Sequence, residues 1–559
     1  MDDSAFAGRG ETVKETVERS LVPRIVDLPP ARFALELRPG QDLAAVAESL
    51  RGILPDLGAV LAPLSALEPG IVVVELPRHG LRIEDPATVF AAGYALAETL
   101  EVAAAEPDLP TDFFPEEPPA APDVGLRQES LGGVLGGCWV AREPHLDGRP
   151  GWALETIRAV QAWRVSAAQG RPSRGRGILI AQPDTGITAH AELRGVNSAS
   201  GFDFLGADHD PTDPLTGANP GHGTATASVA VSPPMLRVTG SAPDAAHMPL
   251  RAIESVVRVT QVTVARSIDW AVEHGAAVIT MSLGGIPSFS LHRAVRRAVA
   301  ADVIVLAAAG NCVGAVVWPA RYDECIAVAG TNAADARWPG SCQGAAVDIS
   351  APGQNVFHAD VPAGSGAGGE HVNQGQGTSL AVALTAGAAA LWLAHHGRAN
   401  LVRQARARGE TLQVMFRRLL QATSRRPLGW NSFQMGPGIV NAEALLLADL
   451  DLGRDREAVD HVLGAPDSEM TSVASLVAEL VNFDAVDSTE LDWHRFGPEL
   501  ATALLHRAAA ASADVQPELP GAATVTEQLG TAVDNEYLRG WLGLPPVEAA
   551  PTQRVGEKR

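Results

Sequence analysis

Between residues 150 and 450 the chain alternates short, continuously apolar runs with segments of helical periodicity. The apolar runs are GILIAQPD, HMPLRAI, AAVITMSL, DVIVLAAAG and CIAVAG, and the helical segments include TVARSIDWAVEHG and LHRAVRRAVAA. A strand that is apolar on both sides has to be buried on both faces, which is typical of a parallel sheet covered by helices. The alternation therefore predicts an α/β fold. In such a fold, functional side chains gather beyond the carboxyl ends of the strands.

The region from 32 to 115 has a different order of elements. The segments RFALELRP, GAVLAPLSAL, GIVVVELP and VAAAEPDL are strand-like, and they enclose two helical segments, DLAAVAESLRGIL and ATVFAAGYALAETL. The order β-α-β-β-α-β is that of the ferredoxin-like split motif. We therefore expect a small α+β domain in front of the α/β domain.

Changes in composition indicate where the domains end. The stretch TDFFPEEPPAAPDV is rich in proline and acidic residues, which predicts an exposed linker. The last hundred residues are mostly helical in pattern, carry no motif, and end in a tail that we expect to be disordered. The expected division is a polar N-terminal segment, a ferredoxin-like domain, a linker, the α/β domain and a helical extension, at 1–31, 32–115, 116–149, 150–450 and 451–559.

The charge balance argues against a nucleic-acid partner. Lysine and arginine together number 43 against 65 acidic residues, and the formal net charge is −22. Binding to phosphates requires clustered basic side chains, whereas this chain has two lysines, Lys14 and Lys558, and scattered arginines. The partners expected on this basis are not nucleic acids.

The sequence contains no segment that is typical of a leader or a membrane span. The first residues, MDDSAFAGRGETVKETVERS, are polar, and the longest apolar candidate follows Ser379, where alanine, glycine and Thr385 suit a protein core better than lipid. We therefore expect a cytoplasmic protein without a membrane partner. Four cysteines lacking C-x-x-C spacing predict reduced, mostly buried thiols, with a disulfide such as Cys325–Cys342 as the alternative.

The segment GQGTSLAVALTAGAAALWLAHH places Ser379 at the start of a helix-length run. A helix N-terminus offers unpaired N–H groups and a positive dipole end, which favour an oxyanion that develops beside an attacking hydroxyl. The alternative for such a serine in isolation is a simple helix cap. A serine hydroxyl becomes a good nucleophile only beside a base, so the interpretation depends on partners elsewhere in the chain.

Three further side chains occur where such partners would be expected. Asp184 ends the apolar run GILIAQPD, His222 begins a small-residue helix in PGHGTATASVAV, and Asn311 follows DVIVLAAAG. A carboxylate, an imidazole and an amide are the groups that would orient a base, accept the serine proton and bind an oxyanion. Taken singly, each could instead be a turn or cap residue.

Together, these motifs resemble the subtilisin-like serine peptidases, or subtilases. The motifs are Asp-Thr-Gly at 184–186, His-Gly-Thr at 222–224, Ala-Ala-Gly-Asn at 308–311 and Gly-Thr-Ser-x-Ala at 377–381, in the chain order Asp, His, Ser of that family. Secondary markers are TAHAEL after Asp184, the strand MSLGG, the turn SAPG at 350–353 and GPGIVNA. The resemblance runs from about Trp152 to Ala444.

The resemblance implies a role for each matching position. Ser379 would be the nucleophile, His222 the general base and acid, Asp184 the carboxylate that orients His222, and Asn311 an oxyanion donor together with the N–H of Ser379. The family pattern further implies that three residues pair their backbone with an extended substrate. These are Ser282, Leu283 and Gly284. A strand edge without a ligand is the alternative for them.

The ferredoxin-like domain would, by the same resemblance, correspond to an inhibitory propeptide that assists folding. Its last segment, near AEPDLP, would lie in the substrate cleft until it is cut between residues 108 and 150. A permanently attached domain for partner recognition is the alternative.

Some positions depart from the family pattern. Ala225 replaces the second histidine of His-Gly-Thr-His, and Leu380 to Leu384 replace the usual Met-Ala-Ser-Pro-His after the serine. The loop FDFLGADHDPTDPLTG carries Asp203, Asp208, Asp210 and Asp213, which could bind calcium as in some relatives or form a solvated acidic turn. We assign no metal to this loop.

Two other functions fit parts of the pattern. Asp-Thr-Gly also occurs in aspartic peptidases, but these need a second such aspartate, and a dimer supplying one would leave Ser379, His222 and Asn311 unexplained. A catalytically silent subtilase fold that serves as a binding scaffold would not require all four chemical residues. We therefore predict a serine endopeptidase that acts on protein or peptide substrates without an organic cofactor. The C-terminal extension could cover the cleft, bind a partner or mediate self-association.

Overall fold

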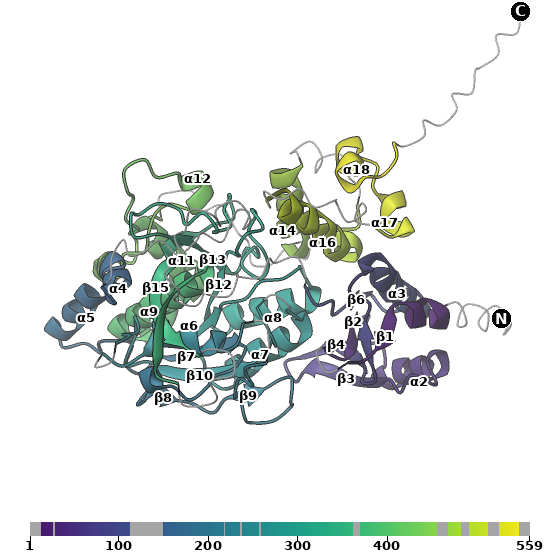
Figure 1. Cartoon of the computed structure of the whole chain (residues 1–559), viewed down its shortest axis with the longest axis horizontal. Coiled ribbons are helices and arrows are strands. Elements are labelled where there is room, and N and C mark those ends of the chain that lie inside the picture. Colours follow the sequence, from purple (N-terminus) through teal and green to yellow (C-terminus); the bar gives the residue numbers. More distant parts are fainter. Residues whose placement is uncertain are drawn as a thin grey trace, which may run out of the picture.

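The computed structural model describes residues 13–25, 28–111, 149–216, 219–234, 237–256, 259–361, 369–454, 468–481, 491–512 and 525–546. Its centre is an eight-stranded sheet with the strand order β14-β13-β12-β11-β7-β10-β8, in which β9 also pairs with β10 (Figure 1). All of these pairings are parallel. The strands are β7 (Leu179–Asp184), β8 (Asn197–Ser198), β9 (Phe202–Asp203), β10 (Ala246–Arg251), β11 (Val278–Met281), β12 (Ile304–Ala308), β13 (Ile326–Thr331) and β14 (Ile349–Pro352).

Helices cover both faces of this sheet, and the side chains of β12 show how. Ile304 and Leu306 join the apolar cluster around α9 (Thr378–His396), whereas Val305 and Ala307 join the cluster around α7 (Gln261–Glu273) and α8 (Phe289–Ala300). Burial on both faces explains why the strands are continuously apolar. The predicted α/β fold with a helix-covered parallel sheet is therefore confirmed.

Further helices complete the layer around α9. They are α4 (Trp152–Thr156), α5 (Ala159–Ala168), α6 (His222–Val231), α10 (Arg398–Ala407), α11 (Leu412–Ala422) and α13 (Ala442–Leu447). The short helix α12 (Ser432–Met435) packs with the other apolar cluster through Met435. By length and composition α9 could cross a membrane, yet its apolar window is entirely buried inside the protein. The segment SAPG, predicted as a turn, instead ends strand β14, which pairs with β13. The antiparallel ribbon of β15 (Gln354–Asp360) and β16 (His371–Gln376) was not predicted.

The N-terminal unit has the predicted β-α-β-β-α-β order. Its elements are β2 (Ala31–Glu36), α2 (Leu43–Ile53), β3 (Val60–Ser65), β4 (Glu68–Leu76), α3 (Pro86–Thr99) and β6 (Ala104–Pro107). The antiparallel sheet has the order β3-β4-β2-β6, which is the ferredoxin-like arrangement, and β1 (Leu21–Pro23) pairs separately with β5 (His79–Leu81). The expected linker at 116–149 lies outside the described residues except for its last one.

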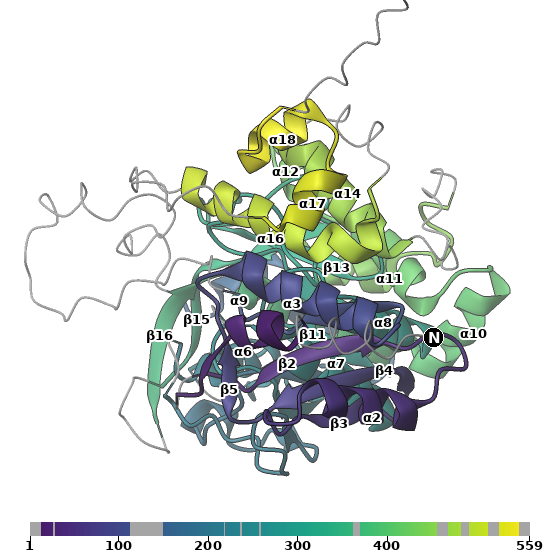
Figure 2. The ribbon, with the colours of Figure 1, turned by 90° about the vertical axis from the view of Figure 1, so that its right-hand side faces the viewer.

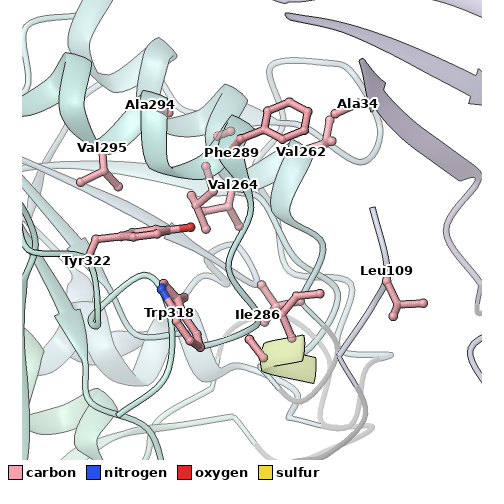
Figure 3. Packing of buried hydrophobic residues seen from close by; sticks show 14 of the residues in the cluster. Ala34, Leu109, Val262, Val264, Ile286, Phe289, Ala294, Val295, Trp318 and Tyr322 are labelled. Carbon is pink, nitrogen blue, oxygen red and sulfur yellow. The ribbon is translucent and has the colours of Figure 1, made fainter. Parts of the chain in front are cut away.

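The N-terminal sheet packs against α7 and α8. Figure 3 shows Ala34 and Leu109 of the N-terminal unit across from Val262, Ile286 and Phe289, all within one buried cluster. Polar contacts surround this apolar seam. The Nε of Arg266 donates to the carbonyl of Leu64 at 3.0 Å, and Arg297 forms ion pairs with Glu68 and with Asp269 of α7.

Helices near the C-terminus contact both other parts of the chain. They are α14 (Ser468–Leu480), α16 (Trp493–Ser512), α17 (Glu527–Ala532) and α18 (Glu536–Leu542), and α16 lies against α3 and β6 (Figures 1 and 2). The hydroxyl of Tyr94 in α3 donates to Glu499 of α16 at 2.8 Å. On the other side, Arg321 forms an ion pair with Glu479 of α14 at 2.7 Å. This region therefore bridges the N-terminal unit and the α/β domain.

The close packing of α9 leads to a stability prediction. A β carbon on Gly387 would lie 1.9 Å from Oγ of Ser241 and 2.6 Å from its Cβ. We expect Gly387→Ala to destabilise the protein by about 1–3 kcal/mol because the core has to expand. Gly52→Ala in α2 is the matched control: no heavy atom lies within 4 Å of the added carbon, so stability should rise by roughly 0.5–1 kcal/mol. Denaturant unfolding measures both, and an unchanged Gly387→Ala variant would contradict this account.

Candidate active site

Asp184 and His222 meet at the carboxyl edge of the central sheet. β7 ends at Asp184 and α6 begins at His222. A β carbon on Gly223 would lie 2.0 Å from the carbonyl oxygen of Gly186, so only glycine allows α6 to start this close to the loop after β7. As a result, Nδ1 of His222 lies 2.7 Å from Oδ1 of Asp184.

The carboxylate of Asp184 is almost fully buried and saturated with donors. Its side chain is 1% exposed. Oδ1 also accepts from the N–H of Thr185 at 2.7 Å, and Oδ2 lies 3.1 Å from Oγ1 of Thr226 and 3.3 Å from Nε2 of Gln182. Because an ionised carboxylate only accepts, Nδ1 of His222 has to carry the shared proton. The basic lone pair of the neutral imidazole then lies on Nε2.

Ser379 is the second residue of α9, as predicted from the glycine and threonine before it. The side chain is buried, and its Oγ donates to the carbonyl of Ser282 at 3.4 Å. α9 packs directly against α6, the helix that begins with His222. The N-termini that carry the hydroxyl and the imidazole therefore belong to two neighbouring helices.

Asn311 follows β12 and is held by the first residue of α9. Its Oδ1 accepts from the N–H of Thr378 at 3.0 Å and from the hydroxyl of Thr378 at 2.8 Å. This fixes the amide so that Nδ2 points elsewhere. A β carbon built on Gly377 would lie 3.5 Å from that Nδ2 and 3.7 Å from the N of Ser379. Both nitrogens thus lie close to the same point beside Ser379, and two neighbouring N–H donors are what an oxyanion site requires.

The three predicted substrate-binding residues follow β11 and are buried. Ser282, Leu283 and Gly284 come directly after Met281, the last residue of the strand. The hydroxyl of Ser282 donates to the carbonyl of Ser379 at 3.0 Å. The structure therefore places the start of this segment against the start of α9.

Two acidic residues at the end of the N-terminal unit cap two helices of the α/β domain. Glu106 accepts from the N–H groups of Phe289 and Ser290 at the start of α8, at 2.9 and 3.2 Å. Asp108 accepts from the N–H groups of Gln261 and Val262 at the start of α7, at 2.7 and 3.0 Å. Helix N-termini favour negative charge, so these carboxylates complement both dipoles.

After Asp108 the chain continues toward the segment that follows β11. The N–H of Thr111 donates to the carbonyl of Val259 at 3.4 Å, and the N–H of Val259 donates to the hydroxyl of Thr111 at 3.1 Å. On its other side, Cγ2 of Thr111 would lie 3.4 Å from a β carbon on Gly285. Thr111 therefore lies between Val259 and Gly285, the residue that follows Ser282–Gly284 in the chain.

Sequence reasoning missed four side chains that hold the site together. Gln182 and Thr226 lie beside Asp184, Thr378 orients Asn311, and Thr185 donates to Asp213 at 2.7 Å. Gln182 had a readable signal, because it is the one polar side chain before Asp184 in the apolar run GILIAQPD. Thr226 stands four residues after His222, the spacing that puts two side chains on one helix face.

The acidic loop at 203–213 uses its carboxylates in turns and ion pairs. Asp203 accepts from two backbone N–H groups and pairs with Arg251 at 2.7 Å. Asp213 accepts from the N–H of Gly221 at 3.0 Å as well as from Thr185, so it ties the loop to the site. In the part of the chain that the structure describes, no group of three metal-ligating side chains is placed to hold an ion.

The cysteines differ in state. Cys325 and Cys342 are free and buried, as expected, and burial raises the pKa of Cys342 to about 12. The alternative of a disulfide between these two is therefore wrong. Cys312, next to Asn311, is disulfide-bonded, so the expectation of reduced thiols fails for this residue. Cys138 lies outside the described residues.

Comparison with known proteins identifies the class that this fold and site define. The model of the subtilase family matches residues 175–435, a range that contains Asp184, His222, Asn311 and Ser379. Subtilisin Savinase from Lederbergia lenta is 33% identical over 296 residues, which cover 52% of this chain and 97% of that protein. The chain therefore belongs to the subtilase family and is a serine endopeptidase.

Other relatives match the same class. Thermitase from Thermoactinomyces vulgaris is 33% identical over 265 residues, covering 46% of this chain and 87% of that protein. Among solved structures, a protease from Pseudoalteromonas arctica aligns with 24% identity and a TM-score of 0.43, covering 50% of this chain and 92% of that one. The protease domain of PatA aligns with 25% identity and a TM-score of 0.40, and the alignment covers 49% of this chain and 94% of that one.

The capping carboxylate of Glu106 predicts a pH dependence of stability. Burial raises its pKa from the ordinary 4.5 to about 7, against the opposing effect of its hydrogen bonds. The folded protein therefore binds this proton more tightly than the unfolded chain, and its contribution to stability is lost as the pH rises from about 4.5 through 7. We expect the melting temperature of wild type to fall in this pH range and that of Glu106→Gln to fall less. The remaining fall in the variant would come from Asp108, because burial also raises the pKa of that residue. The same pH slope in wild type and variant, with exposed Glu84→Gln as control, would contradict it.

Proposed function

We propose that Ser379, His222 and Asp184 form a catalytic triad that hydrolyses peptide bonds of protein or peptide substrates through an acyl-enzyme. The hydroxyl of Ser379 turns from the carbonyl of Ser282 toward Nε2 of His222, which accepts its proton as Oγ attacks the scissile carbonyl carbon. His222 then protonates the leaving amine as the C–N bond breaks. Water attacks the resulting ester by the same route in reverse and restores the free hydroxyl.

The observation that carries this proposal is the 2.7 Å contact between Asp184 and His222. It gives the imidazole a fixed tautomer and a nearby negative charge, which is what a general base in acyl transfer requires. The proximity of Nδ2 of Asn311 to the backbone N of Ser379 supports stabilisation of the oxyanion that forms when Oγ attacks. Donors that are already in place beside the developing charge lose little energy to reorganisation in the transition state.

We further propose that the N-terminal unit controls access to this site. The caps formed by Glu106 and Asp108 attach the unit to α8 and α7, and Thr111 lies beside Gly285, the residue after Ser282–Gly284. An extended chain there would pair as an added strand and compete with a substrate for the same backbone groups. Removal of this segment, by a cut between 108 and 150 or by release of the unit, would then activate the enzyme.

A fluorophosphonate probe tests the nucleophile, because it forms a covalent bond only with an activated serine. We expect purified wild type to be labelled and to hydrolyse casein, and Ser379→Ala to lose both the label and any cut between 108 and 150. Ser424→Ala, whose hydroxyl donates only within its own turn at Gln421, is the matched control and should retain both. Intact mass spectrometry reports label and cut together.

Either of two results would contradict the proposed triad. One is labelling or self-cleavage that persists in Ser379→Ala. The other is a folded wild type, already cut within 108–150, that neither labels nor hydrolyses casein, which would support a silent binding scaffold.

Weakening the two caps tests control by the N-terminal unit. Each helix cap contributes roughly 0.5–2 kcal/mol, so Glu106→Ala/Asp108→Ala should shift the unit away from the cleft about tenfold or more. We expect faster hydrolysis of a short chromogenic peptide by the double variant at equal labelled-site concentration. Glu48→Ala/Glu84→Ala changes two acidic residues elsewhere on the unit and serves as the control. An unchanged rate in the cap variant would contradict the proposal that the N-terminal unit controls access to the site. It would not affect the proposed triad.

A further inference from the structure

Behind Asp184 lies a buried pair of polar side chains, Gln182 and His247. They come from the neighbouring parallel strands β7 and β10, and they are 4% and 1% exposed. The surrounding strand residues are apolar, so a buried amide and imidazole have to satisfy their hydrogen bonds with each other or with the site.

The partners of Gln182 determine which way its amide points. Its Nε2 lies 2.9 Å from the carbonyl oxygen of Gly223, which can only accept. The Oε1 therefore faces His247, whose Nε2 lies 2.7 Å away and has to donate. His247 is thus an Nε2–H tautomer, and its acceptor Gln182 cannot rotate without losing both bonds.

The same amide reaches the catalytic carboxylate. Nε2 of Gln182 lies 2.6 Å from Oγ1 of Thr226 and 3.3 Å from Oδ2 of Asp184. The hydroxyl of Thr226 lies 3.1 Å from that Oδ2 but also 3.1 Å from the carbonyl of His222. The same hydroxyl lies 3.3 Å from the carbonyl of Gly223, so its one proton has three acceptors within reach. When Gln182 donates to Oγ1, it occupies a lone pair of Thr226 and leaves the hydroxyl proton available to Asp184.

We propose that Gln182, held in place by His247, is a positioning residue that fixes the carboxylate of Asp184 against His222. The proposal rests on the proposed triad. The contacts of Gln182 and Thr226 with Oδ2 resist rotation about the Cβ–Cγ bond of Asp184, so Oδ1 stays on Nδ1 of His222. Outer partners of a catalytic histidine act in this way by fixing orientation and charge.

The environment of His247 keeps this pair neutral. Burial lowers the pKa of His247 to about 4, while the charge of Asp184 opposes that shift. Among the described residues, Nδ1 of His247 has no hydrogen-bond partner, so a second proton there would be buried without an acceptor. The imidazole therefore supports Gln182 without adding a charge beside Asp184.

Replacing both members of the pair separates positioning from folding. Removing one partner leaves a buried polar group unsatisfied, whereas replacing both with apolar side chains of similar size is close to neutral for stability. We expect Gln182→Leu/His247→Leu to remain folded with a modestly lower melting temperature, because Asp184, Gly223 and Thr226 lose a donor. Its kcat for a peptide substrate should fall roughly tenfold or more with KM unchanged. The rate of fluorophosphonate labelling at Ser379 should fall in parallel.

A second buried pair serves as the matched control. Oγ of Ser166 lies 2.9 Å from Nδ1 of His395, near the opposite end of α9 from Ser379. Ser166→Ala/His395→Leu should leave kcat and labelling unchanged.

Two outcomes would overturn the inference. One is a folded Gln182→Leu/His247→Leu variant with kcat within twofold of wild type. The other is an equal loss of kcat in the Ser166/His395 control. Failure of wild type itself to label at Ser379 would instead overturn the proposed triad, so the two failures are distinguishable.

Discussion

The burial of α9 is the constraint on which the rest of the structure depends. Thr378 to His395 are all buried between the central sheet and the outer helices, so the helix cannot shift along its axis without opening the core. Its N-terminus is therefore held at the carboxyl edge of the sheet. From there, Thr378 orients Asn311, Ser379 contacts the segment after β11, and the packed helix α6 presents His222. One rigid helix therefore fixes the relative positions of site residues that come from distant segments of the chain.

Electrostatics adds a second requirement, because the site contains a carboxylate with 1% exposure. A buried charge is costly unless donors surround it. Thr185, Thr226, Gln182 and His222 fulfil this need, and each comes from β7, α6 or the loop between them. The polar groups that stabilise Asp184 in the fold are therefore the same groups that set its geometry toward His222. Stability and chemistry are coupled at this point.

The three parts of the chain also depend on one another. Asp108 and Glu106 of the N-terminal unit cap α7 and α8 of the α/β domain. Helix α16 packs against α3 of the N-terminal unit, and Glu479 of α14 forms an ion pair with Arg321 of the α/β domain. Burial raises the pKa of Glu499, which accepts from Tyr94 at the contact between α16 and α3. The C-terminal helices thus stabilise the arrangement in which Glu106 and Asp108 cap α8 and α7.

The sequence by itself determined the sheet, the covering helices, the order of the N-terminal unit and the positions of Asp184, His222, Asn311 and Ser379. Hydrophobic periodicity and short motifs are local properties, and local patterns decide which segments form strands and where they end. Only the tertiary structure decided that Gln182 meets His247, that Thr378 holds Asn311, that Glu106 caps α8, and that α16 contacts α3. These pairings join residues far apart in the chain, and they follow from strand order and helix packing, which no single segment encodes.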